Sequence, residues 1–193
     1  MYEAPPIDPE QHLMLRFQAG DEAAFAQLYQ RIRGMVWRFS ARMLGDPEAA
    51  EEAAQDILLR VFRARGSYQP TARFRTWLFR IATNHCINER QRAWRRREVG
   101  TPEGTAGLAL PDHQDPASAS EAAALARAIQ RALAALPPQQ RAAVVLARYE
   151  GCSMEQVAEA LDLPSVGAAK LLLHRARRAL EEQLRPFLPQ EAP

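Results

Sequence analysis

The stretch FRTWLFRIATNHCINERQRAWRRR, residues 74–97, is the part of the sequence that decides the fold. Its apolar residues recur every three or four positions, which predicts an α-helix with one buried face. The expected buried residues are Phe74, Trp77, Leu78, Ile81 and, further along, Trp94. Eight arginines lie between positions 73 and 97, against the single acidic residue Glu89. A solvated face normally mixes both charge signs, so this imbalance favours contact with a polyanion.

Helical signals also fill the sequence before this stretch. Asp21 is a natural N-cap for a helix whose apolar residues recur at helical spacing as far as Met43. Gly45 is a natural end for that helix, and Asp46 with Pro47 begins another. No segment alternates polar and apolar residues with period two, so the chain is predicted to be all-α, without a sheet.

The composition changes between residues 99 and 120, where Gly, Pro, Ser, Thr and Ala dominate. No apolar periodicity survives there, so residues 99–120 are predicted to be a flexible linker. The linker would separate a helical bundle at residues 10–98 from a smaller helical domain at residues 121–187.

The smaller domain shows the length pattern of a helix-turn-helix. Helices are expected over residues 121–135 and 139–149, ending at the prolines after Leu136 and at Gly151. Ser153, with Gln156 three residues later, forms a capping-box pattern, and Ser165 caps a final long helix. Two capped helices joined by residues 162–164 match a helix-turn-helix, although such pairs also occur as plain structure.

A row of cations and amides follows one side of the helix at residues 74–97. Arginine neutralises phosphates, whereas amides hydrogen-bond base edges, so the row indicates nucleic-acid contact rather than a simple solvated face. Tyr68 in the preceding loop and His85 would supply rings on which an unstacked base could lie. The expected DNA-contacting residues are Tyr68, Arg73, Thr76, Arg80, Asn84, His85, Asn88 and Arg92, with Gln91 beside them.

An acidic block marks the start of the helix at residues 46–65. Its residues are Asp46, Glu48, Glu51, Glu52 and Asp56, with no basic residue among them. Acidic side chains favour the first turn of a helix, so a plain solvent face is one interpretation, and a docking surface for a basic protein is the other.

Several classes of protein are excluded by what the sequence lacks. The four histidines are scattered, and no nucleotide-binding glycine motif or paired-carboxylate arrangement is present, so no catalytic residue, cofactor or metal is expected. Cys86 and Cys152 lack metal-ligand spacing and fit a reducing cytosol. No signal segment or membrane-spanning stretch is apparent, which predicts a cytoplasmic protein without membrane insertion.

The sequence resembles the extracytoplasmic-function (ECF) group of bacterial sigma factors. Four stretches carry the resemblance: GDEAAF at 20–25, GDPEAAEEAAQD at 45–56, FRTWLFRIATN at 74–84, and a segment from Leu136 to Arg177 that includes HRAR. The resemblance implies a region 2-like bundle and a region 4-like helix-turn-helix domain. It implies a transcription initiation factor that binds core RNA polymerase, directs it to promoters and opens DNA at the −10 element.

The resemblance also assigns partners to the charged surfaces. The polymerase-binding residues would contact the clamp helices of the β′ subunit, and they are Asp46, Glu51, Glu52, Gln55 and Asp56. The smaller domain would contact the β flap. The residues expected at the −35 element are Ser165, Lys170, His174, Arg175, Arg177 and Arg178. An anti-sigma factor is a further candidate partner. A stand-alone helix-turn-helix regulator, or an interaction protein using only its acidic helix, remains an alternative.

One departure from the family concerns the final helix. The family pattern Gly-Thr-Val-Lys-Ser-Arg-Leu-His is here Gly-Ala-Ala-Lys-Leu-Leu-Leu-His, which places Ala168, Leu171 and Leu172 at positions that are polar in relatives. We therefore expect weak or unusual recognition of the −35 element. We expect Leu171 and Leu172 to be exposed and to meet an inhibitor or another helix instead.

Overall fold

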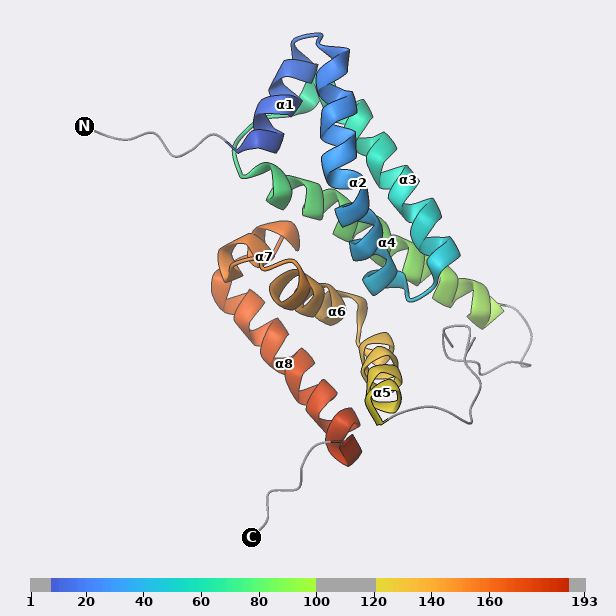
Figure 1. Ribbon diagram of the computed structural model, residues 1–193. Coiled ribbons are helices and arrows are strands. Elements are labelled where there is room, and N and C mark those ends of the chain that lie inside the picture. The colour runs from blue at the N-terminus through green and yellow to red at the C-terminus, as the bar shows by residue number, and fades with distance from the viewer. Residues whose placement is uncertain (1–7, 100–120, 188–193) are drawn as a thin grey trace.

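The computed structural model describes residues 8–99 and 121–187, and every regular element in these two ranges is helical (Figure 1). The predicted all-α class is therefore confirmed. The first range holds α1 (Pro9–Gln18), α2 (Glu22–Leu44), α3 (Pro47–Arg63), the 3₁₀ turn η1 (Ala64–Ser67) and α4 (Phe74–Val99). The second holds α5 (Glu121–Ala135), α6 (Pro138–Val144), the π-helical segment η3 (Val145–Tyr149), α7 (Met154–Ala160), α8 (Val166–Leu184) and η4 (Arg185–Phe187). Of the predicted linker, positions 100–120 lie outside the described residues.

Helix boundaries follow the capping residues of the sequence. The Asp21 carboxylate accepts a hydrogen bond from the Ala24 amide at 3.1 Å, which satisfies a free amide at the start of α2. At the other end of α2, Gly45 has a φ of 79°, in the left-handed region where a residue without Cβ is favoured. The Asp46 carboxylate then accepts from the Ala49 amide at 2.7 Å and begins α3.

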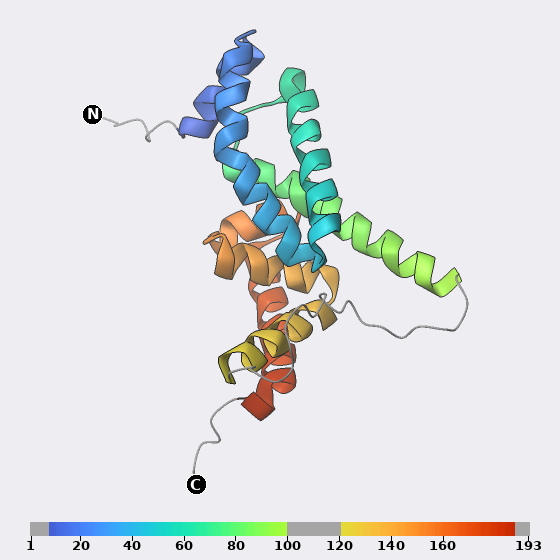
Figure 2. The same ribbon diagram turned by 45° about the vertical axis from the view of Figure 1, so that its right-hand side comes forward.

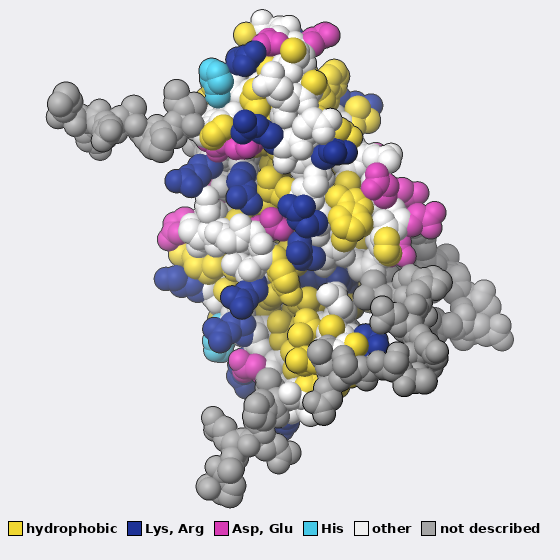
Figure 3. Space-filling view, viewed as in Figure 1, with side chains coloured by type: hydrophobic (Ala, Val, Ile, Leu, Met, Phe, Trp, Pro, Cys, Tyr) yellow, Lys and Arg dark blue, Asp and Glu magenta, His cyan; other side chains and the backbone are white. Residues whose placement is uncertain are grey.

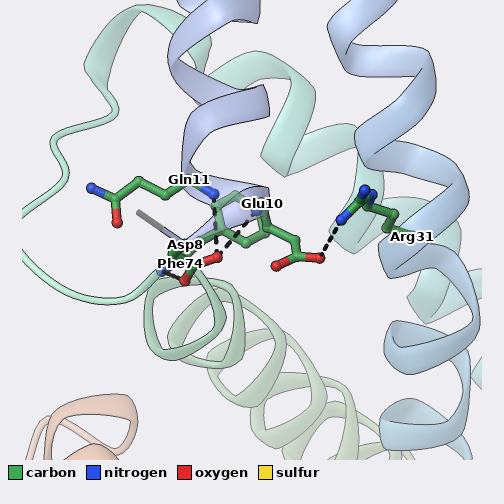
Figure 4. A network of polar contacts seen from close by, with 5 residues as sticks. All are labelled: Asp8, Glu10, Gln11, Arg31 and Phe74. Atoms are coloured by element: carbon green, nitrogen blue, oxygen red, sulfur yellow. Dashed lines mark hydrogen bonds and ion pairs between the residues drawn. The ribbon is translucent and has the colours of Figure 1, made fainter. Parts of the chain in front are cut away.

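Helix α1 is an element that the sequence patterns above do not predict, although its first residues repeat the Asp-Pro signal of α3. The Asp8 carboxylate accepts from the Glu10 and Gln11 amides, and its second oxygen accepts from the Phe74 amide at 3.1 Å (Figure 4). One side chain thus caps α1 and ties it to the first residue of α4. Arg31 on α2 reaches Glu10 at 3.4 Å and holds α1 from its other side.

The first bundle packs α1, α2 and α3 side by side, with α4 crossing beneath them (Figures 1 and 2). Its centre is fully buried and is formed by Leu28, Ile32, Phe39, Ile57 and Leu78. The rings of Phe39 and Phe79 lie 5.3 Å apart and join α2 to α4. The expected buried stripe of α4 is observed as far as Ile81, but Trp94 is 65% exposed, because no other described element packs against that end of the helix.

The second bundle contains the helix-turn-helix that its capping pattern predicts. The Ser153 hydroxyl accepts from the Gln156 amide, and the Gln156 side chain accepts in return from the Ser153 amide. Asp162 turns the chain with a φ of 52°, and the Ser165 hydroxyl accepts from the Ala168 amide to begin α8. These contacts are all within a few residues of each other, so the sequence alone specifies them.

The two bundles do not stand apart. Helices α6 and α7 lie against α4 and the C-terminal end of α2 (Figures 1 and 2). Buried residues of α6 and α7, such as Ala142, Leu146 and Val157, belong to the same apolar core as Phe39 and Phe79 of the first bundle. A smaller, separate cluster around Leu133 and Ala176 joins α5 to α8.

Candidate nucleic-acid interface

Helix α4 presents a continuous polar row to solvent. Arg80, Asn84 and Asn88 are exposed, as are Arg73 just before the helix and Arg92 beyond them. Arg92 pairs with Glu89 at 2.7 Å, which partly neutralises that end of the row. The remaining groups combine guanidinium cations with neutral amides, a set that can hold a nucleic-acid backbone and hydrogen-bond bases.

Thr76 and His85 do not belong to this exposed row. Thr76 is 2% exposed and His85 is 5% exposed. Residues four positions apart are offset by about 40° around the helix axis. Thr76 is therefore offset from Arg80 in the direction away from Asn84 and Asn88, at the margin of the row. Thr76 therefore turns toward the buried side of α4, and His85 points toward α3.

Tyr68 is also buried, with 3% of its surface exposed. Its ring packs edge-on against Trp77 at 4.8 Å, and its backbone oxygen accepts from the Gln18 side chain. Burial raises the pKa of the Tyr68 hydroxyl to about 12, with a smaller contribution from the Asp8 charge. In this conformation Tyr68 anchors the loop before α4 and offers no ring face to a base.

His85 lies close to the acidic helix. Its Nε2 is 3.9 Å from the Asp56 carboxylate, which is itself exposed. Burial lowers the pKa of His85 below its usual value and the Arg60 charge lowers it further, whereas Asp56 and Glu89 oppose the shift. The neutral form of His85 is thus the one that fits the fold.

The His85 environment predicts how stability depends on pH. A base whose pKa is lower in the folded chain contributes stability above its unfolded pKa, about 6.5, and this contribution is lost as the pH falls. We expect the free energy of unfolding, measured by urea denaturation, to decrease between about pH 7.5 and about pH 5.5. His85→Gln cannot titrate and should show a smaller decrease; equal decreases in both proteins would contradict this account.

The acidic residues of α3 form a second exposed surface. Glu51, Glu52, Gln55 and Asp56 are exposed, and Gln55 donates to Glu51 at 3.2 Å. Asp46 is instead used as the N-cap of the helix. Acidic side chains gather at the right of Figure 3, where α3 runs. The arrangement offers carboxylates and one amide to a basic protein surface.

The helix-turn-helix supplies a third charged surface. Lys170, His174, Arg175, Arg177 and Arg178 of α8 are all exposed, and basic side chains gather over this helix at the lower left of Figure 3. Ser165 is exposed but its hydroxyl is engaged in capping. Leu171 is 50% exposed, whereas Leu172 packs against the main core. The expectation of an exposed Leu171–Leu172 pair is therefore wrong for Leu172.

Arginines that join the two bundles were not anticipated from the sequence. Arg141 donates a hydrogen bond to the backbone carbonyl of Arg42, which is 99 positions earlier in the chain. The Arg42 side chain forms an ion pair with Glu150. No local pattern marks these residues, because their partners come from a different bundle. Within the described residues, no cluster of potential metal ligands occurs, and no helix is long and apolar enough to cross a membrane.

Comparison with known proteins identifies the family. The Sigma-70 region 2 model matches residues 28–96, and the Sigma-70, region 4 model matches residues 126–180. The RNA polymerase sigma factor CarQ of Myxococcus xanthus is 38% identical over 173 residues, covering 89% of this chain and 95% of CarQ. The ECF RNA polymerase sigma factor SigW of Bacillus subtilis is 33% identical, covering 86% of this chain and 91% of SigW. The chain belongs to the ECF sigma factors of the sigma-70 family.

The fold agrees with that of a solved sigma factor. The sigma factor RpoE of Bartonella quintana, solved with the anti-sigma factor NepR, matches with a TM-score of 0.65 and 25% identity, covering 83% of this chain and 96% of that one. The present sigma factor therefore directs promoter-specific initiation as a non-enzymatic partner of RNA polymerase. The matches in both bundles remove the alternatives of a stand-alone regulator and of an interaction protein without a DNA role.

Proposed function

We propose that this sigma factor divides its work among three surfaces: α3 binds the polymerase, the exposed row of α4 opens the −10 element, and α8 contacts upstream DNA. The single observation that carries the proposal is the exposed row of α4. Arg73, Arg80, Asn84 and Asn88 combine phosphate-binding and base-binding groups on one side of a helix.

The α4 surface fits a locally melted strand better than a closed duplex. Unstacking a base costs a few kcal/mol, which backbone contacts from arginine and hydrogen bonds from amides can offset. Tyr68 is held against Trp77, so in this proposal it fixes the loop rather than stacking on the base. Thr76 and His85 likewise support the helix from its buried side.

The α3 surface is proposed to dock on the β′ clamp helices of the polymerase. Glu51, Glu52, Gln55 and Asp56 are exposed and face away from the core, so that they are available to a basic partner. The region 4 domain would contact the β flap. A sigma factor that works with the polymerase would be cytoplasmic, and we propose that location for this chain. Because a relative was solved with an anti-sigma factor, we also propose a regulator of that kind for this chain.

The α8 surface is proposed to recognise the −35 element weakly. Its cations are exposed and can bind phosphates, but Leu171 offers no polar group to a base edge, and Leu172 is turned toward the core. Phosphate contacts fix position without reading sequence, so upstream binding would be largely independent of the −35 sequence.

The −35 proposal predicts a gain of function. Scrambling the −35 element should change the amount of run-off transcript made by wild-type holoenzyme by less than about threefold. With an Ala168→Thr/Leu171→Ser variant, the same scrambling should reduce the amount of transcript about tenfold. The matched control is Leu125→Ser, which replaces an exposed leucine of α5 and should behave like wild type. Strong base-specific protection of the −35 element by the wild type, lost on altering Ala168 or Leu171, would contradict the proposal.

The assignment as a whole is tested by reconstitution. Core polymerase mixed with this chain should produce run-off transcripts only from promoters selected by the holoenzyme, and permanganate should detect unpaired thymines at the −10 element. If α4 variants opened the −10 element as well as the wild type does, another surface would melt the DNA.

A further inference from the structure

The C-terminal end of α4 exposes a large apolar ring to solvent. Trp94 is 65% exposed, more than any other large hydrophobic residue in the described parts of the chain. This end of α4 projects beyond both bundles (Figures 1 and 2). A single exposed apolar side chain is common on protein surfaces, so the groups around Trp94 decide what its ring can do.

The end of α4 is strongly basic. Between positions 90 and 98 the sequence has five arginines and one acidic residue, Glu98. Arg95, next to Trp94, is exposed. Glu89 pairs with Arg92 at 2.7 Å and lies about 140° around the helix axis from Trp94. A partner that meets the ring at this end of the helix therefore meets a net positive charge, which favours a polyanion.

The exposed row of α4 continues into this end of the helix. Gln91 is seven positions beyond Asn84 and is offset from it by about 20° around the helix axis. Arg95 is eleven positions beyond Asn84 and is offset by about 20° in the opposite direction. Both side chains are exposed. Trp94 is offset by about 80° from Asn84, at the margin of the same side. A strand that lies along the row would therefore reach an amide, a cation and a ring.

Trp94 carries the one exposed aromatic ring among the described side chains of α4. The sequence predicts that Tyr68 and His85 supply rings for an unstacked base, but both are buried. Trp77 is half-buried, and its ring packs against Tyr68. Base–aromatic stacking requires a free ring face, and in duplex DNA each base already stacks on its neighbours. Trp94 can therefore accept an unpaired base, whereas the buried rings cannot.

Trp94 lies well beyond the base-binding part of the row. At about 1.5 Å per residue, Trp94 is about 15 Å from Asn84 along the helix axis. Stacked nucleotides of one strand are about 3.4 Å apart, so this distance corresponds to about four or five nucleotides. The chain continues from α4 to the region 4 domain, whose proposed DNA contact is upstream of the −10 element. The end of α4 is therefore expected on the upstream side of the base that Asn84 contacts.

We propose that Gln91, Trp94 and Arg95 form a second nucleic-acid site, in which the Trp94 ring stacks on an unpaired base at the upstream edge of the melted strand. Arg95 neutralises a phosphate beside that base, and Gln91 offers a further amide to the strand. The inference rests on the proposed −10 role of α4 and adds the stacking ring that the buried Tyr68 does not provide. Stacking tolerates any base, so the site favours opening without reading sequence.

The direct test measures binding of the holoenzyme to fork DNA that is single-stranded through the −10 element. Trp94→Ala should weaken this binding about tenfold, because one base loses its aromatic stacking partner. Trp94→Phe keeps a ring and should weaken binding less than about threefold. Affinity is measured by fluorescence anisotropy of labelled DNA, with core polymerase saturated with each sigma variant. Losses of equal size in the two variants would overturn the stacking role.

Abasic nucleotides locate the stacked base. At one position, removing the base should weaken binding by wild-type holoenzyme about tenfold and binding by the Trp94→Ala holoenzyme by less than about twofold. This position should lie within about five nucleotides upstream of the one at which Asn84→Ala has the corresponding effect. If each abasic nucleotide weakened binding equally in wild type and Trp94→Ala, the ring would contact no base and the proposal would fail.

The matched control is Trp37→Ala, which removes the exposed tryptophan of α2. Its holoenzyme should bind fork DNA as the wild type does, and circular dichroism should show that both alanine variants keep their helices. An equal loss of fork binding in the two variants would mean that Trp94 has no specific role. If Trp94→Ala lowered affinity for core polymerase rather than for fork DNA, the ring would belong to a protein interface and the proposal would be wrong.

The Arg80→Ala/Asn84→Ala variant separates this inference from the proposed function of α4. If that variant loses fork binding and Trp94→Ala does not, the row keeps its proposed function and the second site is refuted. If neither variant loses fork binding, the proposed −10 role of α4 fails, and the second site fails with it. Losses in both variants, with the abasic effect confined to Trp94, would support both proposals.

Discussion

Replacing Arg80 and Asn84 with alanine is expected to reduce promoter opening about 100-fold while polymerase affinity changes by less than about threefold. Both side chains are exposed, and their spacing of four residues places them on the same side of α4. Losing one phosphate contact and one base contact removes about 1–3 kcal/mol each, and about 1.4 kcal/mol corresponds to a factor of ten. Opening is measured by permanganate reactivity and affinity by fluorescence anisotropy of labelled sigma factor with core polymerase.

A matched control for this variant exists on α2. Gln27→Ala/Arg31→Ala also removes one amide and one arginine four residues apart on an exposed helix surface. It should leave promoter opening within about twofold of wild type, because surface substitutions away from a binding site have small effects. A loss of opening as large as in the Arg80/Asn84 variant would mean that general charge, rather than the α4 row, drives melting.

Reversing one charge on the acidic surface of α3 is expected to weaken polymerase binding while leaving promoter opening nearly normal. Gln55→Ala/Asp56→Lys should weaken core polymerase binding at least about 100-fold, because placing like charges in an interface costs several kcal/mol. Polymerase saturated with the variant should still open the −10 element nearly normally. Affinity is measured by the same anisotropy assay, and opening is measured at saturating sigma factor.

The control for the α3 variant lies at the end of α8. Glu182→Lys/Gln183→Ala likewise replaces one carboxylate with lysine and one amide with alanine at exposed positions, and should bind polymerase as wild type does. Since Asp56 lies 3.9 Å from His85, circular dichroism should first show that the α3 variant keeps its helices. Equal loss of binding and opening in the α3 and α4 variants would contradict the proposal that these surfaces have separate roles.

The sequence predicted which of the proposed contact residues on α4 and α3 are exposed, because exposure on a helix follows from periodicity. Arg80, Asn84, Asn88, Gln55 and Asp56 are exposed as expected. Periodicity did not predict the burial of Thr76 and His85, because a helix packed on two sides leaves only a narrow exposed strip. The burial of Tyr68, which was expected to stack on a base, was not predicted for a different reason: its ring partner, Trp77, lies on a helix that the loop itself must position.

The same distinction separates local from long-range structure throughout the chain. The sequence by itself determined the helix class, the ends of α2 and α3 and the helix-turn-helix, because Asp21, Asp46 and Ser153 bond to amides three residues away. Only the tertiary structure decided that α6 and α7 cover α4. That contact joins Arg141 to the Arg42 carbonyl across 99 positions, and burial of apolar surface, which is non-directional, leaves no local pattern in the sequence.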